Sequence, residues 1–204
     1  VIPLRDANPT RRTPIVTLGL IVVTSAVFGI ELLVEASGGE PALAALLETY
    51  GAIPSKVSAA LAGGGDPGAA ALGVVGSLFL HGGWLHLIGN MLFLWIFGNN
   101  IEDRLGRLPY LAFYLLGGVA AALTQVWIDP TSDIPLVGAS GAIAATLGAY
   151  IVLYPRARIL TLVFLVFFYQ LLEVPALLVL GFWFLLQLVD GVASLGATTA
   201  GGGV

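Results

Sequence analysis

Cysteine is absent from the 204 residues, and charged residues make up only 10% of them. Without cysteine the chain has no disulfide bond, no thiolate nucleophile and no cysteine-ligated metal. Soluble domains carry about 25% charged residues, so eight basic and twelve acidic side chains cannot cover the surface of a water-soluble globule of this size. The composition also excludes a disordered chain and, for want of a basic face, a nucleic-acid binder. With only two histidines, no metal or other cofactor is expected.

Hydrophobic residues, at 58%, instead indicate a polytopic membrane protein. A helix needs about 20 mostly apolar residues to cross a bilayer. The charge-free windows predict an all-α bundle of transmembrane helices with about five spans, at residues 15–34, 82–98, 109–128, 137–154 and 173–190. The apolar segment 159–170 is too short for a further span, and we expect it at the membrane interface or as the entrance to the last span.

The basic residues predict how these spans cross the membrane, because positively charged residues stay on the cytoplasmic side. Three arginines precede the first span, so residues 1–14 are expected in the cytoplasm. Residues 36–80 then form a long external connection, and residues 81–204 carry the remaining spans of a single membrane domain, 1–204. Seven of the eight basic residues agree with this topology; the exception is Lys56. We expect a multi-pass protein of a bacterial or archaeal plasma membrane.

Two polar residues lie inside the second predicted span. His86 and Asn90 are four residues apart, which puts them on one face of a helix. Polar groups inside a membrane are costly and indicate function. The alternative interpretation is structural, with His86 at a helix start and Asn90 bonded to a neighbouring helix. His81 is expected further out, at the interface.

Ser140 stands in the segment VGASGAI at the start of the fourth predicted span. Glycine on both sides permits a tight entry turn, and the amides of the first helical turn could face a developing oxyanion. The alternative is close helix packing through Gly141, Ala145 and Gly148. The topology places Ser140 and His86 at one depth, roughly 5–8 Å below the outer ends of their helices. A hydroxyl and two neutral donors at one depth suit an acyl-transfer site.

Together with the turn IEDRLG, these segments resemble the rhomboid intramembrane serine proteases. HGGWLHLIGNMLFLW is similar to the family's histidine-and-asparagine second helix, and IEDRLG to its ExxxG turn, with Glu102 and Gly106. VGASGAI is similar to its GxSG motif, with Gly138, Ser140 and Gly141. From the residues alone, Glu102 is expected in a solvated turn held by local charge pairs, with no part in chemistry. The resemblance implies a rhomboid-like fold of six core helices.

The resemblance also implies an activity: a serine endopeptidase that cleaves transmembrane helices of other membrane proteins near the outer face of the bilayer. Ser140 is then the nucleophile of a Ser–His dyad, and its amide, His86 and Asn90 bind the oxyanion. The general base of this family is a histidine on a last helix C-terminal to the serine. No histidine follows Ser140 in the 204 residues, so we expect a C-terminally incomplete chain that is inactive as it stands.

Two smaller departures and two other functions remain open. Some members of the family carry an aromatic residue four positions after the serine, where this chain has Ala144, and some carry a Trp–Arg pair in the first external loop, which residues 36–80 lack. Without a base the chain is equally a non-catalytic rhomboid-like protein that binds membrane helices. A small transporter is less consistent with the sequence, because the predicted spans hold almost no charge.

Overall fold

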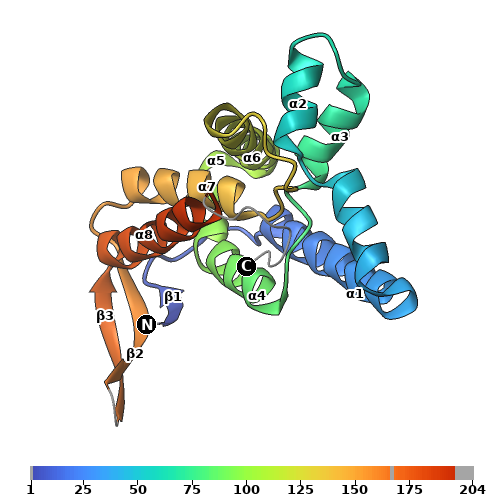
Figure 1. Cartoon of the computed structure of the whole chain (residues 1–204). Coiled ribbons are helices and arrows are strands. Elements are labelled where there is room, and N and C mark those ends of the chain that lie inside the picture. The colour runs from blue at the N-terminus through green and yellow to red at the C-terminus, as the bar shows by residue number, and fades with distance from the viewer. Residues whose placement is uncertain (1, 166–167, 196–204) are drawn as a thin grey trace.

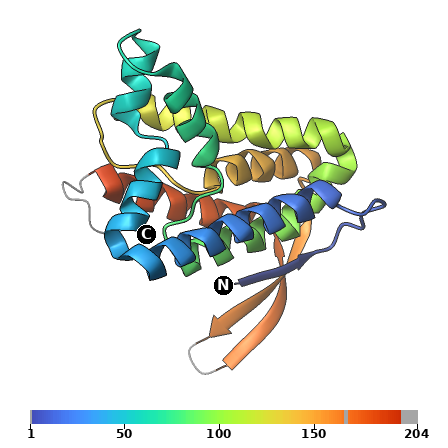
Figure 2. The same ribbon diagram turned by 90° about the vertical axis from the view of Figure 1, so that its right-hand side faces the viewer.

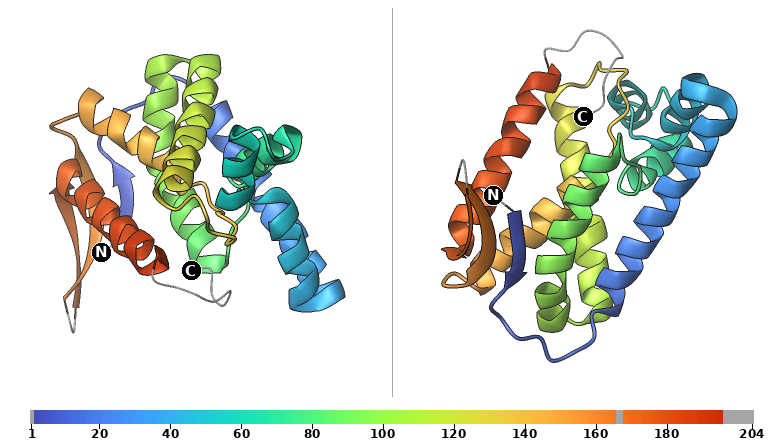
Figure 3. Two further views of the ribbon diagram at one scale, coloured as in Figure 1. Left: turned by 45° about the horizontal axis from the view of Figure 1, so that its top comes forward. Right: turned by 90° about the horizontal axis from the view of Figure 1, so that it is seen from below.

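The computed structural model describes residues 2–165 and 168–195, and this part of the chain is mostly helical (Figure 1). The longer helices lie roughly side by side, with the short helices α2 and α3 at one end of the molecule and a small sheet at the other (Figures 2 and 3). The elements in chain order are β1 (Ile2–Asp6), α1 (Ile15–Tyr50), α2 (Pro54–Leu61), α3 (Pro67–Gly76), α4 (Trp84–Phe93), the π-helical turn η1 (Leu94–Gly98), α5 (Asn99–Leu105), α6 (Arg107–Ile128), α7 (Ser140–Leu153), β2 (Arg158–Leu165), β3 (Phe168–Pro175) and α8 (Ala176–Leu195).

Helix α1 is longer than the predicted span 15–34 and is kinked beyond it. Gly39 has a φ of 70°, outside helical geometry, and Pro41 follows two residues later. Proline lacks an N–H and clashes with the preceding turn, so the helix bends at this point. The predicted external connection 36–80 is therefore largely helical, since it comprises the second arm of α1 and the helices α2 and α3.

Three further predicted spans correspond to helices with shifted ends. The span 82–98 begins at Trp84 and continues through η1 and α5 to Leu105. The span 109–128 is α6, and the span 137–154 begins at Ser140 as α7. Among the described helices, α1 and α6 are both long and apolar enough to cross a membrane, whereas α7 and the apolar part of α8 are shorter.

Helices α6 and α7 approach each other through small residues. A Cβ at Gly141 would collide with Ala121, and a Cβ at Gly117 would lie 2.5 Å from the Cβ of Ala145. The predicted small-residue packing is thus confirmed at Gly141 and Ala145. A Cβ at Gly148 would meet nothing within 4 Å, so this third residue does not belong to the contact.

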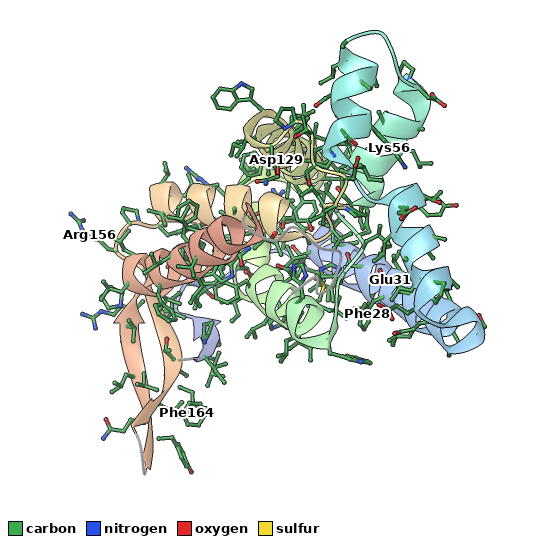
Figure 4. The ribbon with its side chains drawn as sticks, in the orientation of Figure 1. Phe28, Glu31, Lys56, Asp129, Arg156 and Phe164 are labelled. Atoms are coloured by element: carbon green, nitrogen blue, oxygen red, sulfur yellow. The ribbon has the colours of Figure 1, made fainter. Side chains whose placement is uncertain are left out.

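The prediction of an all-α fold is wrong in one part of the chain, because β1, β2 and β3 form an antiparallel sheet in that order. The segment 159–170 was expected at the membrane interface or as the entrance to the last span, but it supplies most of β2 and the start of β3. The predicted span 173–190 begins in β3, and α8 starts only at Ala176. The β-branched and aromatic residues of the segment 159–170 favour an extended backbone. Ile159 and Thr161 are buried, while Phe164 is exposed on the projecting hairpin (Figure 4).

Segments predicted on the same side of the membrane contact one another. On the predicted outer side, Ala52 pairs with Leu136 in an isolated bridge. On the predicted inner side, the Asp6 carboxylate accepts hydrogen bonds from Asn100 Nδ2 at 2.8 Å and from the Tyr150 hydroxyl at 3.0 Å. Burial raises the pKa of Asp6, against the opposing effect of these bonds. The orientation of the chain across the membrane stays a prediction.

Candidate functional site

The turn before α7 has a backbone that requires glycine. Gly138 has a φ of 124°, in the left-handed region that residues with a Cβ rarely adopt. Its N–H donates to the carbonyl oxygen of Ser77 at 2.8 Å, which fixes the turn against the end of α3. Ala139 is buried, and the half-buried Ser140 is the first residue of α7. The hydroxyl therefore stands where the backbone amides of a first helical turn lack intrahelical acceptors.

His86 and Asn90 lie against this turn. A Cβ at Gly138 would be 2.6 Å from Cε1 and 2.7 Å from Nε2 of His86, and 3.8 Å from Nδ2 of Asn90. Glycine at 138 thus serves twice, since it supplies the positive φ and leaves space for the imidazole ring. The structure brings together His86, Asn90 and Gly138, and Ser140 follows Gly138 by two residues.

His81 is a member of this cluster that the sequence placed elsewhere. It was expected at the interface, but its side chain is 2% exposed, and its ring centroid lies 5.0 Å from that of His86. Its Nδ1 is 3.2 Å from the carbonyl oxygen of Phe79, and its Nε2 is 3.0 Å from Nδ2 of Asn90. A carbonyl and an amide NH2 in these places assign the proton to Nδ1 and make Nε2 an acceptor. Burial, with His86 nearby, lowers the pKa of His81 to about 4, so the ring is neutral.

Glu31 of α1 was also missed by sequence reasoning. Its side chain is 2% exposed, and its two carboxylate oxygens accept the backbone N–H of His81 at 3.2 and 3.3 Å. Figure 4 shows Glu31 with Phe28 on α1, and the ring of Phe28 meets that of Trp84, at the start of α4, at 5.0 Å. An acidic residue inside a predicted span was the available signal, because such residues are rare and mark function or a specific partner.

Glu102 is buried rather than part of a solvated turn. Its carboxylate accepts the backbone N–H of Val16 at 3.0 Å and the N–H and hydroxyl of Thr17, each at 2.8 Å. It therefore caps the N-terminus of α1, where amides lack acceptors and a negative charge is favourable. Gly106, the other residue of this motif, has a φ of 87° and ends α5. Both residues serve the packing of the end of the bundle that is predicted to face the cytoplasm.

The cluster has the components of a site that stabilises negative charge on oxygen. Neutral imidazole and carboxamide groups donate hydrogen bonds without carrying a charge, and the start of a helix adds a favourable dipole. In the described part of the chain, no group of three or more histidine, aspartate or glutamate side chains could hold a metal ion.

Comparisons with known proteins agree with these motifs. The family model described as "Rhomboid domain" matches residues 69–202. "Rhomboid protein 1, mitochondrial" of Saccharomyces cerevisiae is 35% identical over 97 residues, which cover 46% of this chain and 28% of the yeast protein. "Rhomboid protease AarA" of Providencia stuartii is 34% identical over 89 residues, 37% of this chain and 32% of that protein. "Rhomboid protease GluP" of Bacillus subtilis is 31% identical over 126 residues, 61% of this chain and 23% of that protein.

The matched segments span about a quarter to a third of these relatives. No solved structure matches the chain. Other relatives have mitochondrial or chloroplastic names, so the comparisons give no support to a bacterial or archaeal membrane in particular. The predicted resemblance to an intramembrane serine protease family and the predicted membrane location agree with the matched domain and with the named proteases. The family model covers more than half of the chain, which is therefore an integral membrane protein that belongs to the rhomboid family.

Proposed function

We propose that this protein is an intramembrane serine endopeptidase that cleaves transmembrane helices of other membrane proteins near the outer face of the bilayer. The observation that supports this most is the packing of His86 and Asn90 on Gly138, two residues before Ser140 at the start of α7. The proposal includes an N-terminus inside the cytoplasm or its organellar equivalent and about five membrane-crossing helices. The relatives named as proteases support the same activity.

In the proposed mechanism the Ser140 oxygen attacks the carbonyl carbon of the scissile peptide bond while a general base takes the hydroxyl proton. The negative charge that develops on the carbonyl oxygen is stabilised by the Ser140 amide and by the side chains of His86 and Asn90. The base returns its proton to the leaving amine, and an acyl-enzyme remains. Water, deprotonated by the same base, then hydrolyses the ester and restores the serine.

The identity of the general base and the preferred substrate are inferred from different arguments. The family resemblance implies a histidine C-terminal to Ser140, and none follows it in the 204 residues. The activity is therefore tested in an extended form, in which a histidine-bearing helix from a rhomboid relative is joined after Val204. On the substrate side, a helix protects its own amide bonds, so helices with small or helix-breaking residues near the outer face are the preferred targets.

The test is cleavage of a model transmembrane substrate in liposomes by the extended form. Ser140→Ala is expected to abolish cleavage, because no other side chain supplies the attacking oxygen. His86→Ala and Asn90→Ala are expected to lower kcat by about 10²–10³ with little change in KM, since their bonds strengthen only as charge develops. Full activity of Ser140→Ala would overturn the proposal. A variant that changes KM alone would place that residue in packing.

A second candidate is a non-catalytic rhomboid-like protein that binds membrane helices. The packing of α4 against the turn before α7 would serve such a protein without a general base. The liposome assay distinguishes the two candidates. A binder captures the substrate helix without cleaving it, both as the 204-residue chain and as the extended form, and Ser140→Ala does not change this result. A small transporter would instead give solute flux across the same liposomes.

A further inference from the structure

A buried acid outside the proposed mechanism lies one contact away from the site. Glu31 sits in α1, fifty residues before His81, and its carboxylate contacts the site through the His81 backbone N–H. Burying a carboxyl group is unfavourable unless hydrogen bonds compensate for the loss of water. A residue held at this position against that penalty is expected to have a structural or functional partner, and the partner here is His81.

The contacts of His81 connect Glu31 to Asn90. Its backbone is held by the Glu31 carboxylate, and its ring is held at Nδ1 by the carbonyl oxygen of Phe79. With Nδ1 protonated, Nε2 has a lone pair that accepts one N–H of the Asn90 amide at 3.0 Å. The amide of Asn90 is thereby fixed with its nitrogen, not its oxygen, toward His81.

This orientation determines what Asn90 presents to the site. A carboxamide nitrogen carries two hydrogens, and His81 uses one of them. The other remains for the side of the group that faces Gly138, whose Cβ position lies 3.8 Å from Nδ2. A flipped amide would place an oxygen there, which would repel a developing oxyanion instead of stabilising it.

We propose that Glu31 is a positioning residue, which holds Asn90 in its donor orientation through His81. The proposal rests on the proposed function for its effect on rate, but the connection from Glu31 to the tautomer of His81 stands independently of any reaction. Glu31 does not touch substrate in this account. It acts from the first helix, through the loop that carries His81, on a side chain of α4.

Replacing Glu31 by leucine removes the acceptor and keeps most of the volume. In the extended form we expect Glu31→Leu to lower kcat by about 10–100-fold with KM unchanged, because a small misplacement of a catalytic donor has effects of this size. Glu31→Gln retains one carbonyl oxygen toward the His81 N–H and is expected to stay within about threefold of the parent protein. Glu35→Leu is the matched control, since Glu35 is exposed one turn further along α1. It is expected to have no effect.

The readout that a purely structural role would not move is the tautomer of His81. The 204 residues contain two histidines, so the 15N spectrum of the 15N-histidine-labelled 204-residue chain in micelles contains two rings, which His86→Gln assigns. The parent protein and Glu31→Gln are expected to show His81 protonated at Nδ1, and Glu31→Leu to show exchange between tautomers. If Glu31→Leu does not fold, Glu31→Asp, whose shorter side chain withdraws the carboxylate, takes its place.

Each combination of results decides the question. A changed tautomer together with a lowered kcat supports the proposal. An unchanged tautomer in Glu31→Leu, or a changed tautomer with unchanged kcat, overturns it. If no form of the protein cleaves substrate, the proposed function fails, and the tautomer alone then decides whether Glu31 positions His81 and Asn90.

Discussion

Gly138 is the single residue on which the shape of the site depends most. Its φ of 124° and the 2.6 Å separation between its Cβ position and His86 Cε1 are independent reasons for glycine. GxSG as a sequence motif indicated only that a tight turn was possible. The contact with His86 shows that the same glycine also leaves space for the proposed oxyanion donors.

Gly138→Ala is therefore expected to destabilise the protein by about 1–3 kcal/mol, from strain and overpacking against His86, and to reduce cleavage by the extended form. Gly148→Ala in α7, the helix that follows this turn, is the control, because a Cβ there meets nothing within 4 Å. It is expected to be neutral or slightly stabilising. Unfolding in mixed micelles measures both variants. Equal stability of the two would show that the turn adapts and that the space beside Gly138 is not required.

His81 gives the site a dependence on pH. The folded protein holds the pKa of His81 near 4, below its ordinary value of 6.5, so the unfolded chain binds more protons between these values. The contribution of a neutral His81 to stability is complete above pH 6.5 and is lost as the pH falls toward 4.

The expected result is that the parent protein loses more stability between pH 7.5 and pH 5 than His81→Gln does. Glu31 and His86, the neighbouring titratable groups, are present in both proteins, so the difference between the two curves isolates His81. Thermal unfolding in detergent at both pH values is the measurement. Parallel losses in the two proteins would contradict the assignment of a buried neutral His81.

At the scale of elements, the start of α1 is held to α5 by one carboxylate. Glu102 of α5 accepts three hydrogen bonds from Val16 and Thr17 at the start of α1. Glu102 is 86 positions from Val16 and 85 positions from Thr17 in the sequence, so the cap is a tertiary contact and not a local one. The contact gives the ExxxG segment a place in the fold, although Glu102 has no role in the proposed mechanism.

Glu102→Gln places an amide NH2 against backbone donors and is expected to lower the free energy of unfolding by about 1–3 kcal/mol. Glu40→Gln, at an exposed position of α1, is the control and is expected to change it by less than about 0.5 kcal/mol. Denaturation with SDS in mixed micelles measures both. An unfolding free energy of Glu102→Gln equal to that of Glu40→Gln would rule out the cap as a stabilising contact.

At the scale of the whole molecule, the sequence predicted the helices that have apolar length and missed the elements whose pattern is ambiguous. Residues 109–128 contain no charge and form α6 nearly as predicted. Residues 159–170 are equally apolar but too short for a span, and a short apolar run does not distinguish strand from helix. Their pairing with β1 and β3 is a long-range choice that local pattern does not contain.

The same limit applies to the site. Spacing and topology predicted that His86, Asn90 and the GxSG turn lie together, since helical period and depth are local properties. His81 and Glu31 were missed because their roles depend on how α1 packs against the loop before α4. That contact joins residues fifty positions apart, and the periodicity of each helix does not predict such a contact.

The central claim is that Ser140 is a nucleophile served by donors from α4. It is tested most directly by locating the adduct that a fluorophosphonate probe forms in liposomes, by peptide mass spectrometry. The extended form is expected to carry the adduct on Ser140. Its Ser140→Ala variant and a variant without the added histidine are expected to carry no adduct, and the 204-residue chain is expected to carry little. An adduct on another residue, or none on the folded extended form, would contradict the claim. Equal labelling of Ser140 in the 204-residue chain would show that a residue already present acts as base, and the division of roles between His86 and a later histidine would be wrong.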